Sequence, residues 1–237
     1  HHMENRFQWK CANKFSLLFL IVVYFFGYMF LVPVLARNLT LLLNPNAIVM
    51  SIPILTILYA IILVLSVLIT RPLWQEAWDS FKQNIVRNLF EIITMTFFVL
   101  ALNFALSMIV SLISGTPESV NQENIKVNTT IAPIFMLFSS VIFAPIVEES
   151  VFRGGIFSYC RKYMGFVPSA IISGFFFGCI HVMGSFITFQ FTDLVYLVVY
   201  GGLGFFFCYC YEKKNSIVSS AGVHALNNLI SFMLLGV

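Results

Sequence analysis

The sequence predicts an all-α, polytopic transmembrane helical bundle of seven to eight helices with a cytoplasmic N-terminus, and three observations support this fold class. Apolar residues make up 59% of the 237 residues and charged residues only 10%, whereas soluble domains average about 25% charged residues. The 27 Phe are far more than a water-exposed surface tolerates. Seven apolar segments are each long enough to cross a bilayer. A net charge of +3 is too small to indicate a nucleic-acid partner.

The apolar segments define a single membrane domain. They cover residues 15–36, 47–70, 86–114, 131–158, 167–189, 193–211 and 216–236. Residues 71–84 carry three aromatic residues among charges, which predicts an interfacial amphipathic helix and a possible eighth helix. Gly154-Gly155 is a point at which the fourth segment could divide in two.

The domain has two parts. Residues 3–130 supply the N-terminal helices, and residues 131–237 form the core that carries all the motifs described below. His1 and His2 resemble the remnant of an expression tag and are excluded from the fold.

Basic residues are distributed unevenly between the two sides of the predicted bundle. With the N-terminus inside, ten lie on the cytoplasmic side: Arg6, Lys10, Lys14, Arg71, Lys82, Arg87, Arg161, Lys162, Lys213 and Lys214. Only Arg37 and Lys126 lie outside. Because cytoplasmic loops are enriched in Lys and Arg, we expect a cytoplasmic N-terminus, an external C-terminus and an external loop at 115–130. The short loops and the Phe- and Ile-rich composition suggest the cytoplasmic membrane of a bacterium.

Ionisable residues within the predicted spans are the first candidates for a functional site, because burying them in a membrane is costly. They are Glu91, Glu148, Glu149, Arg153, His181 and His224. The two histidines are the only ones apart from His1 and His2. Glu91 lies near the cytoplasmic end of its span, where we expect it to reach the surface or cap the helix.

Glu148 and Glu149 are expected to differ in their surroundings. Glu149 and Arg153 are four residues apart, the favoured order for an ion pair along a helix. Glu148 is rotated by about 100° from Glu149, so it remains unpaired and is suited to general-base catalysis. The alternative is a packing salt bridge with Glu148 as a bystander. Pro145, three residues earlier, predicts a kink, either for packing or beside the reacting carboxylate.

The two histidines are predicted to meet Glu148 at one depth. His181 follows a small-residue face at Ala170, Gly174 and Gly178, which allows close approach of another helix. His224 and Asn228 are four apart and share a helix face. At about 1.5 Å per residue, the four polar residues lie roughly 12–21 Å from the cytoplasmic face. Isolated packing histidines are the alternative, but three helices converging in depth favour a common cavity.

These residues resemble the signature of the CAAX-protease and bacteriocin-processing family of intramembrane glutamic peptidases. An EExxxR motif runs from Glu148 to Arg153, an FxxxH motif from Phe177 to His181, and an HxxxN motif from His224 to Asn228. The resemblance covers Pro145 to Asn228 closely.

The resemblance implies a role for each motif residue. Glu148 and His181 would activate a water, His224 and Asn228 would stabilise the oxyanion, and Glu149 with Arg153 would hold the helix. The implied substrate is a membrane-associated peptide, either prenylated or a signalling or bacteriocin-like peptide, cleaved near the cytoplasmic membrane surface. Membrane lipids surround the site.

Three alternatives remain open from the sequence. Zinc could be held by Glu148, His181 and His224, although the HExxH spacing of helical zinc peptidases is absent; we expect no cofactor. A non-catalytic partner or bacteriocin-immunity protein would bind another membrane protein. A proton-coupled transporter is the third, but no internal repeat supports it.

Overall fold

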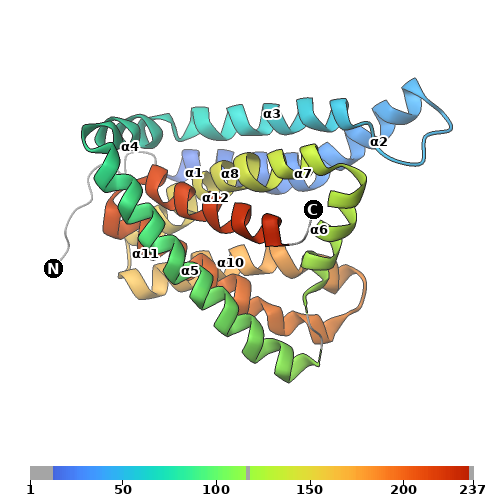
Figure 1. Cartoon of the computed structure of the whole chain (residues 1–237). Helices are drawn as coiled ribbons and strands as arrows, with labels where there is room; N and C mark the ends of the chain where they lie inside the picture. The colour runs from blue at the N-terminus through green and yellow to red at the C-terminus, as the bar shows by residue number, and fades with distance from the viewer. Residues whose placement is uncertain (1–12, 116–117, 235–237) are drawn as a thin grey trace.

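The computed structural model describes residues 13–115 and 118–234, and all the regular secondary structure in these ranges is helical (Figure 1). The described part contains seven helical stretches long and apolar enough to cross a membrane. They are Lys14–Leu43, Ile52–Ile69, Ile85–Ser114, Pro133–Arg161, Phe166–Ile187, Phe191–Lys214 and Ile217–Leu234. The predicted all-α, multi-pass membrane fold is therefore confirmed. The proposed tag remnant, Arg6, Lys10 and the last three residues lie outside the described ranges.

Several spans consist of shorter helical elements that follow one another without a break. The first span consists of α1 (Lys14–Ile21), η1 (Val22–Leu31) and α2 (Val32–Leu43). The fourth consists of α7 (Pro133–Phe138), η2 (Ser139–Phe143), α8 (Ala144–Glu148), η3 (Glu149–Phe157) and α9 (Ser158–Arg161). The sixth consists of η4 (Phe191–Tyr196) and α11 (Leu197–Lys214). The remaining spans are α3 (Ile52–Ile69), α5 (Ile85–Ser114), α10 (Phe166–Ile187) and α12 (Ile217–Leu234).

The predicted amphipathic segment forms a helix, α4 (Arg71–Gln83), at one end of the bundle (Figure 1). Its buried residues are Leu73 and Ala77, four apart on one face. Trp74 donates from Nε1 to Ser150 Oγ at 3.1 Å and so ties α4 to the fourth span. The segment is therefore an eighth helix, packed against the spans that carry the site.

The fourth span does not divide at Gly154-Gly155, contrary to one reading of the sequence. The π-helical η3 runs through both glycines. A Cβ at Gly154 would lie 3.1 Å from Leu73 Cδ1, and one at Gly155 would lie 2.9 Å from Leu20 Cδ1. The two glycines thus let α4 and α1 pack closely against a continuous helix, because a side chain at either position would occupy the same space.

The expected external loop contains a helix, α6 (Val120–Ile131), which is a correction to the sequence-based expectation. Ser119 caps it, accepting a hydrogen bond on Oγ from the Gln122 N–H at 3.1 Å. The Val120 N–H donates to Asp193 Oδ1 at 3.0 Å, which attaches α6 to η4. This helix lies at the end of the bundle opposite α4 (Figure 1).

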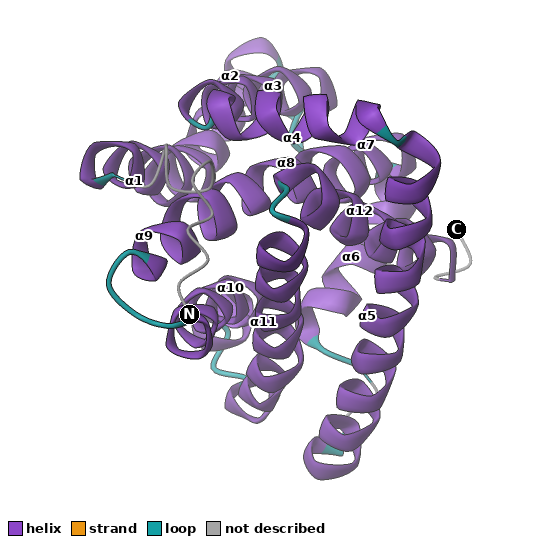
Figure 2. Ribbon diagram, turned by 90° about the vertical axis from the view of Figure 1, so that its left-hand side faces the viewer, coloured by secondary structure: helices purple, strands orange, loops and turns teal. Residues whose placement is uncertain are grey.

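The sequence predicts that a small-residue face lets another helix approach α10 closely, and that helix is α11; the two lie side by side (Figure 2). A Cβ at Gly174 would lie 2.7 Å from Gly201 O and 3.0 Å from Phe205 N. Such backbone-to-backbone contact is possible only with glycine at this position. It holds the His181-bearing end of α10 against α11.

Glu91 lies at the cytoplasmic end predicted for α5 and joins two spans. Its carboxylate pairs with Arg87, with Nε 3.2 Å from Oε1, and with Lys214 on α11. Glu91 therefore has cationic partners near the end of its span and lies apart from the cluster described next.

Candidate active site

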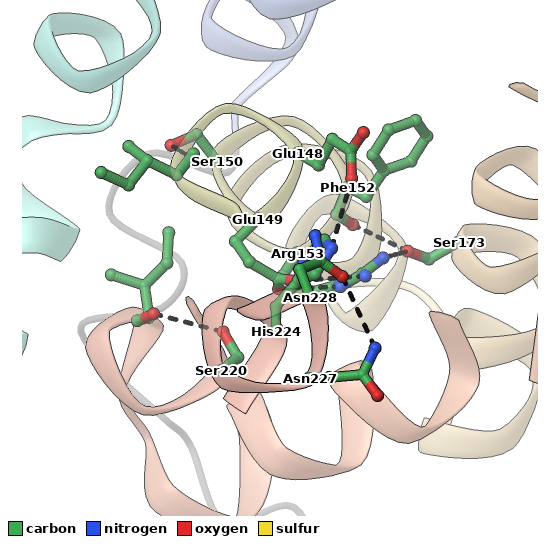
Figure 3. A network of polar contacts seen from close by, with 12 residues as sticks. Glu148, Glu149, Ser150, Phe152, Arg153, Ser173, Ser220, His224, Asn227 and Asn228 are labelled. Atoms are coloured by element: carbon green, nitrogen blue, oxygen red, sulfur yellow. Dashed lines mark hydrogen bonds and ion pairs between the residues drawn. The ribbon is translucent and has the colours of Figure 1, made fainter. Parts of the chain in front are cut away.

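Glu149 and Arg153 form a fully buried ion pair with two hydrogen bonds (Figure 3). The Arg153 Nε and Nη2 donate to the two carboxylate oxygens at 2.9 and 3.0 Å. The guanidinium lies 4.7 Å from the centroid of the Phe177 ring, and Ser173 Oγ is 3.5 Å from Nη1. This paired geometry is what makes two charges tolerable away from water.

Glu148 has a different environment from its neighbour. Its Oε1 lies 4.0 Å from His181 Nε2, and its Oε2 lies 3.5 Å from His224 Nε2. Oε2 is buried and has no hydrogen-bond partner in the described part of the chain. The expected contrast between a paired and an unpaired carboxylate is therefore present in the geometry.

The imidazole of His181 is oriented by a backbone contact. Its Nδ1 lies 2.7 Å from the carbonyl oxygen of Phe177, one helical turn earlier. Because a carbonyl oxygen only accepts, Nδ1 must carry the proton of a neutral ring, and Nε2 is left as an acceptor facing Glu148. The FxxxH spacing thus fixes both the ring position and its tautomer.

The imidazole of His224 lies between the two carboxylates. Nδ1 is 3.0 Å from Glu149 Oε1 while Nε2 faces Glu148. The ring also stacks on Phe207, with 4.5 Å between centroids and 17° between planes. Glu149 therefore has a second partner besides Arg153, and the EE motif positions His224 as well as the guanidinium.

Asn228 joins the last span to the fourth. Its Nδ2 donates to the carbonyl oxygen of Ser140 at 2.8 Å, so one of the two amide N–H groups remains available for another acceptor. Pro145 is buried at the start of α8, between the π-helical η2 and the helical turn that presents Glu148. Such π-helical turns are rare and often occur at functional sites.

The four predicted site residues line one cavity of about 960 Å³. Glu148, His181, His224 and Asn228 reach it from three different spans, together with Phe177. Glu149 and Arg153 are fully buried behind it. The structure brings the residues together as the sequence predicts, and their catalytic roles remain predictions.

The zinc alternative involves three of the same residues. In residues 13–115 and 118–234, no group of three or more His, Cys, Asp or Glu side chains is arranged to hold a metal ion. The Nδ1 atoms of the two histidines contact a carbonyl oxygen and Glu149, respectively, which leaves both Nε2 atoms facing Glu148. No step below uses a metal ion, and the expected absence of a cofactor stays a prediction.

Two aromatic residues on α11 belong to the site but were not identified from the sequence. Tyr200 stacks on His181, with centroids 4.9 Å apart, and Phe207 stacks on His224. Both lie in an apolar run whose packing partners are set only by the tertiary fold. Their spacing of seven residues, two helical turns, was the available signal that they share a face.

The site and its multi-span fold define a membrane protein with a Glu/His cavity, and comparison with known proteins agrees. Residues 130–230 match the family model described as type II CAAX prenyl endopeptidase Rce1-like. This segment contains all three motifs, so the resemblance to CAAX-type membrane peptidases is confirmed there.

The curated relatives share fewer than a third of their aligned residues with this chain. The chain is 29% identical over 111 residues to "Putative membrane peptidase YdiL" of Bacillus subtilis (strain 168), covering 47% of this chain and 41% of that protein. It is 24% identical over 144 residues to "UPF0177 protein YvdC" of Lactococcus lactis subsp. lactis (strain IL1403), covering 56% and 51%. The matches thus span about half the length of these two relatives. No solved structure matches the chain significantly.

Proposed function

We propose that this protein is an intramembrane endopeptidase that hydrolyses a peptide bond with a water activated by Glu148 and His181. The observation that carries the proposal is the unpaired Glu148 carboxylate facing two imidazoles at a cavity, beside a Glu149 that is neutralised by Arg153. The match to the Rce1-like family supports the same reaction class.

The spacing of Glu148 and His181 suits a shared water. Glu148 Oε1 and His181 Nε2 are 4.0 Å apart, within reach of one bridging water molecule, and both are acceptors. A water that donates both of its protons to them keeps its lone pairs for a carbonyl carbon. As the oxygen–carbon bond forms, one proton passes to Glu148.

His224 and Asn228 are suited to the oxyanion that this attack creates. Asn228 retains one free N–H, and His224 can donate from Nε2 when its ring carries both protons, a charge that the adjacent Glu149 stabilises. Collapse of the tetrahedral intermediate breaks the carbon–nitrogen bond. The proton held by Glu148 then passes to the leaving amine, which balances the reaction.

The cavity fits a peptide segment. Its volume of about 960 Å³ lies at the upper end of the range for small-molecule sites. Amide side chains such as Asn121, Gln122 and Asn227 line it, together with apolar residues such as Val32 and Leu55. Such a lining offers hydrogen bonds to a peptide backbone and contacts to apolar or lipidated side chains.

The test compares wild-type protein with Glu148→Gln, each purified and incubated with candidate peptides and analysed by mass spectrometry. The amide keeps the size of the side chain but cannot accept the proton, so the rate should fall by at least about 10²-fold. Folding should be preserved, since Glu148 has no charged partner on its own helix. Equal cleavage by the two proteins would reject this mechanism, and absence of cleavage by both would favour a non-catalytic protein that binds another membrane protein.

A further inference from the structure

The cavity occupies only one half of the membrane bundle. In the fourth span the described lining residues lie between Phe135 and Glu148, and in α12 between His224 and Phe232. In α11 they end at Phe207, seven residues before Lys214. In α3 they lie between Ile52 and Tyr59, in the first half of that helix. Glu148 is therefore at the inner end of a cavity that extends toward one face.

That face is the one that carries α6. One side of α6 lines the cavity through residues at helical spacing, including Gln122, Ile125 and Asn128. The connection between the first two spans contributes Val49 and Met50. The helix α4 lies at the other end of the bundle (Figure 1) and contributes no residue to the described lining.

The charges of the two ends differ. The described basic residues at the α4 end are Lys14, Arg71, Lys82, Arg87, Arg161, Lys162, Lys213 and Lys214. The α6 end has Arg37 and Lys126, and Lys126 pairs with Glu118 at 2.5 Å. By the enrichment of Lys and Arg on the cytoplasmic side, the α4 end is cytoplasmic and the cavity faces outward.

We propose that the substrate enters from the extracytoplasmic face and is an exported or translocated peptide, not one presented at the cytoplasmic surface. The assignment of a peptide as the occupant depends on the function proposed above, whereas the direction of access depends only on the cavity and the charges. Entry from the extracytoplasmic face replaces the expectation, drawn from the family resemblance, that cleavage takes place near the cytoplasmic surface.

The direction of access is tested by cysteine labelling in the full-length protein. Cys11, Cys160 and Cys179 are replaced by Ala, while Cys208 and Cys210 are buried and stay. Single cysteines are then introduced at three places. Asn128→Cys lies on α6, at the mouth of the cavity, Ser107→Cys lies inside the cavity, and Lys162→Cys lies at the α4 end of the bundle. The probe is a positively charged, membrane-impermeant methanethiosulfonate, applied to intact cells and to inverted membrane vesicles, with the parent protein as background.

Asn128→Cys and Ser107→Cys should react in intact cells at least about tenfold faster than the parent, and Lys162→Cys should react only in inverted vesicles. Reaction of Ser107→Cys from the cytoplasmic side only, or from neither side, overturns the proposal. The labelling uses no substrate, so it stands apart from the peptidase assay. If Glu148→Gln did not change cleavage, the proposed function would be rejected. The direction of access found by cysteine labelling would still hold.

Discussion

The ring of Tyr200 stacks on the imidazole of His181, with 4.9 Å between the ring centroids and 21° between the ring planes. The hydroxyl of the same tyrosine lies 2.5 Å from Ser119 Oγ and 3.4 Å from Asn121 Nδ2, at the start of α6. Tyr200 therefore contacts both the candidate water-activating histidine and the helix at the mouth of the cavity.

The two contacts of Tyr200 can be separated by substitution. Tyr200→Ala removes the stacking, worth about 0.5–1.5 kcal/mol, and should lower kcat/KM by roughly 2- to 10-fold. Tyr200→Phe keeps the ring and should retain kcat, while the loss of its hydroxyl bonds should speed amide hydrogen exchange in α6. Wild-type kcat/KM in Tyr200→Ala would show that the stacking does not orient His181.

Glu149→Gln should destabilise the protein, because it leaves the fully buried Arg153 without a charged partner. Breaking such a pair costs about 3–5 kcal/mol. Thermal unfolding in detergent would measure the loss, with Glu148→Gln as the matched control that should unfold like wild type. Combining Glu149→Gln with Arg153→Met removes both charges and should recover part of the stability. A single Glu149→Gln variant as stable as wild type would contradict the assigned role of the pair.

The contact between α10 and α11 predicts opposite effects for two glycines of the same helix. Gly174→Ala would place a Cβ 2.7 Å from Gly201 O and should cost about 1–3 kcal/mol by overpacking. Gly184→Ala meets no atom within 4 Å and should be neutral or stabilising by up to about 1 kcal/mol, since Ala favours helix. The unfolding midpoints of both variants would be measured. Equal midpoints would show that α10 and α11 can move apart without loss of stability.

The spans and the motif residues could be predicted because each depends on local sequence. Apolar length defines a span, and the i,i+4 spacing of Glu149 and Arg153 defines their pairing. The helix α6 was missed because its Asn, Gln and Thr residues are typical of a loop. The Ser119-x-x-Gln122 capping pattern was the available signal for its start. The stacking of Tyr200 on His181 could not be predicted, because it depends on how α10 packs against α11.

Activity should survive complete removal of metal ions. In the described chain, no group of three or more His, Cys, Asp or Glu side chains is arranged to hold a metal ion. The reaction proposed for Glu148 needs only a water and fixed donors. Purified protein would be treated with a strong chelator and dialysed, its zinc content measured by elemental analysis, and its peptide cleavage compared with untreated protein. Cleavage should stay within about twofold. Loss of cleavage that returns on addition of zinc, but not of magnesium, would show that the two Nε2 atoms and Glu148 hold a metal that replaces the proposed general base.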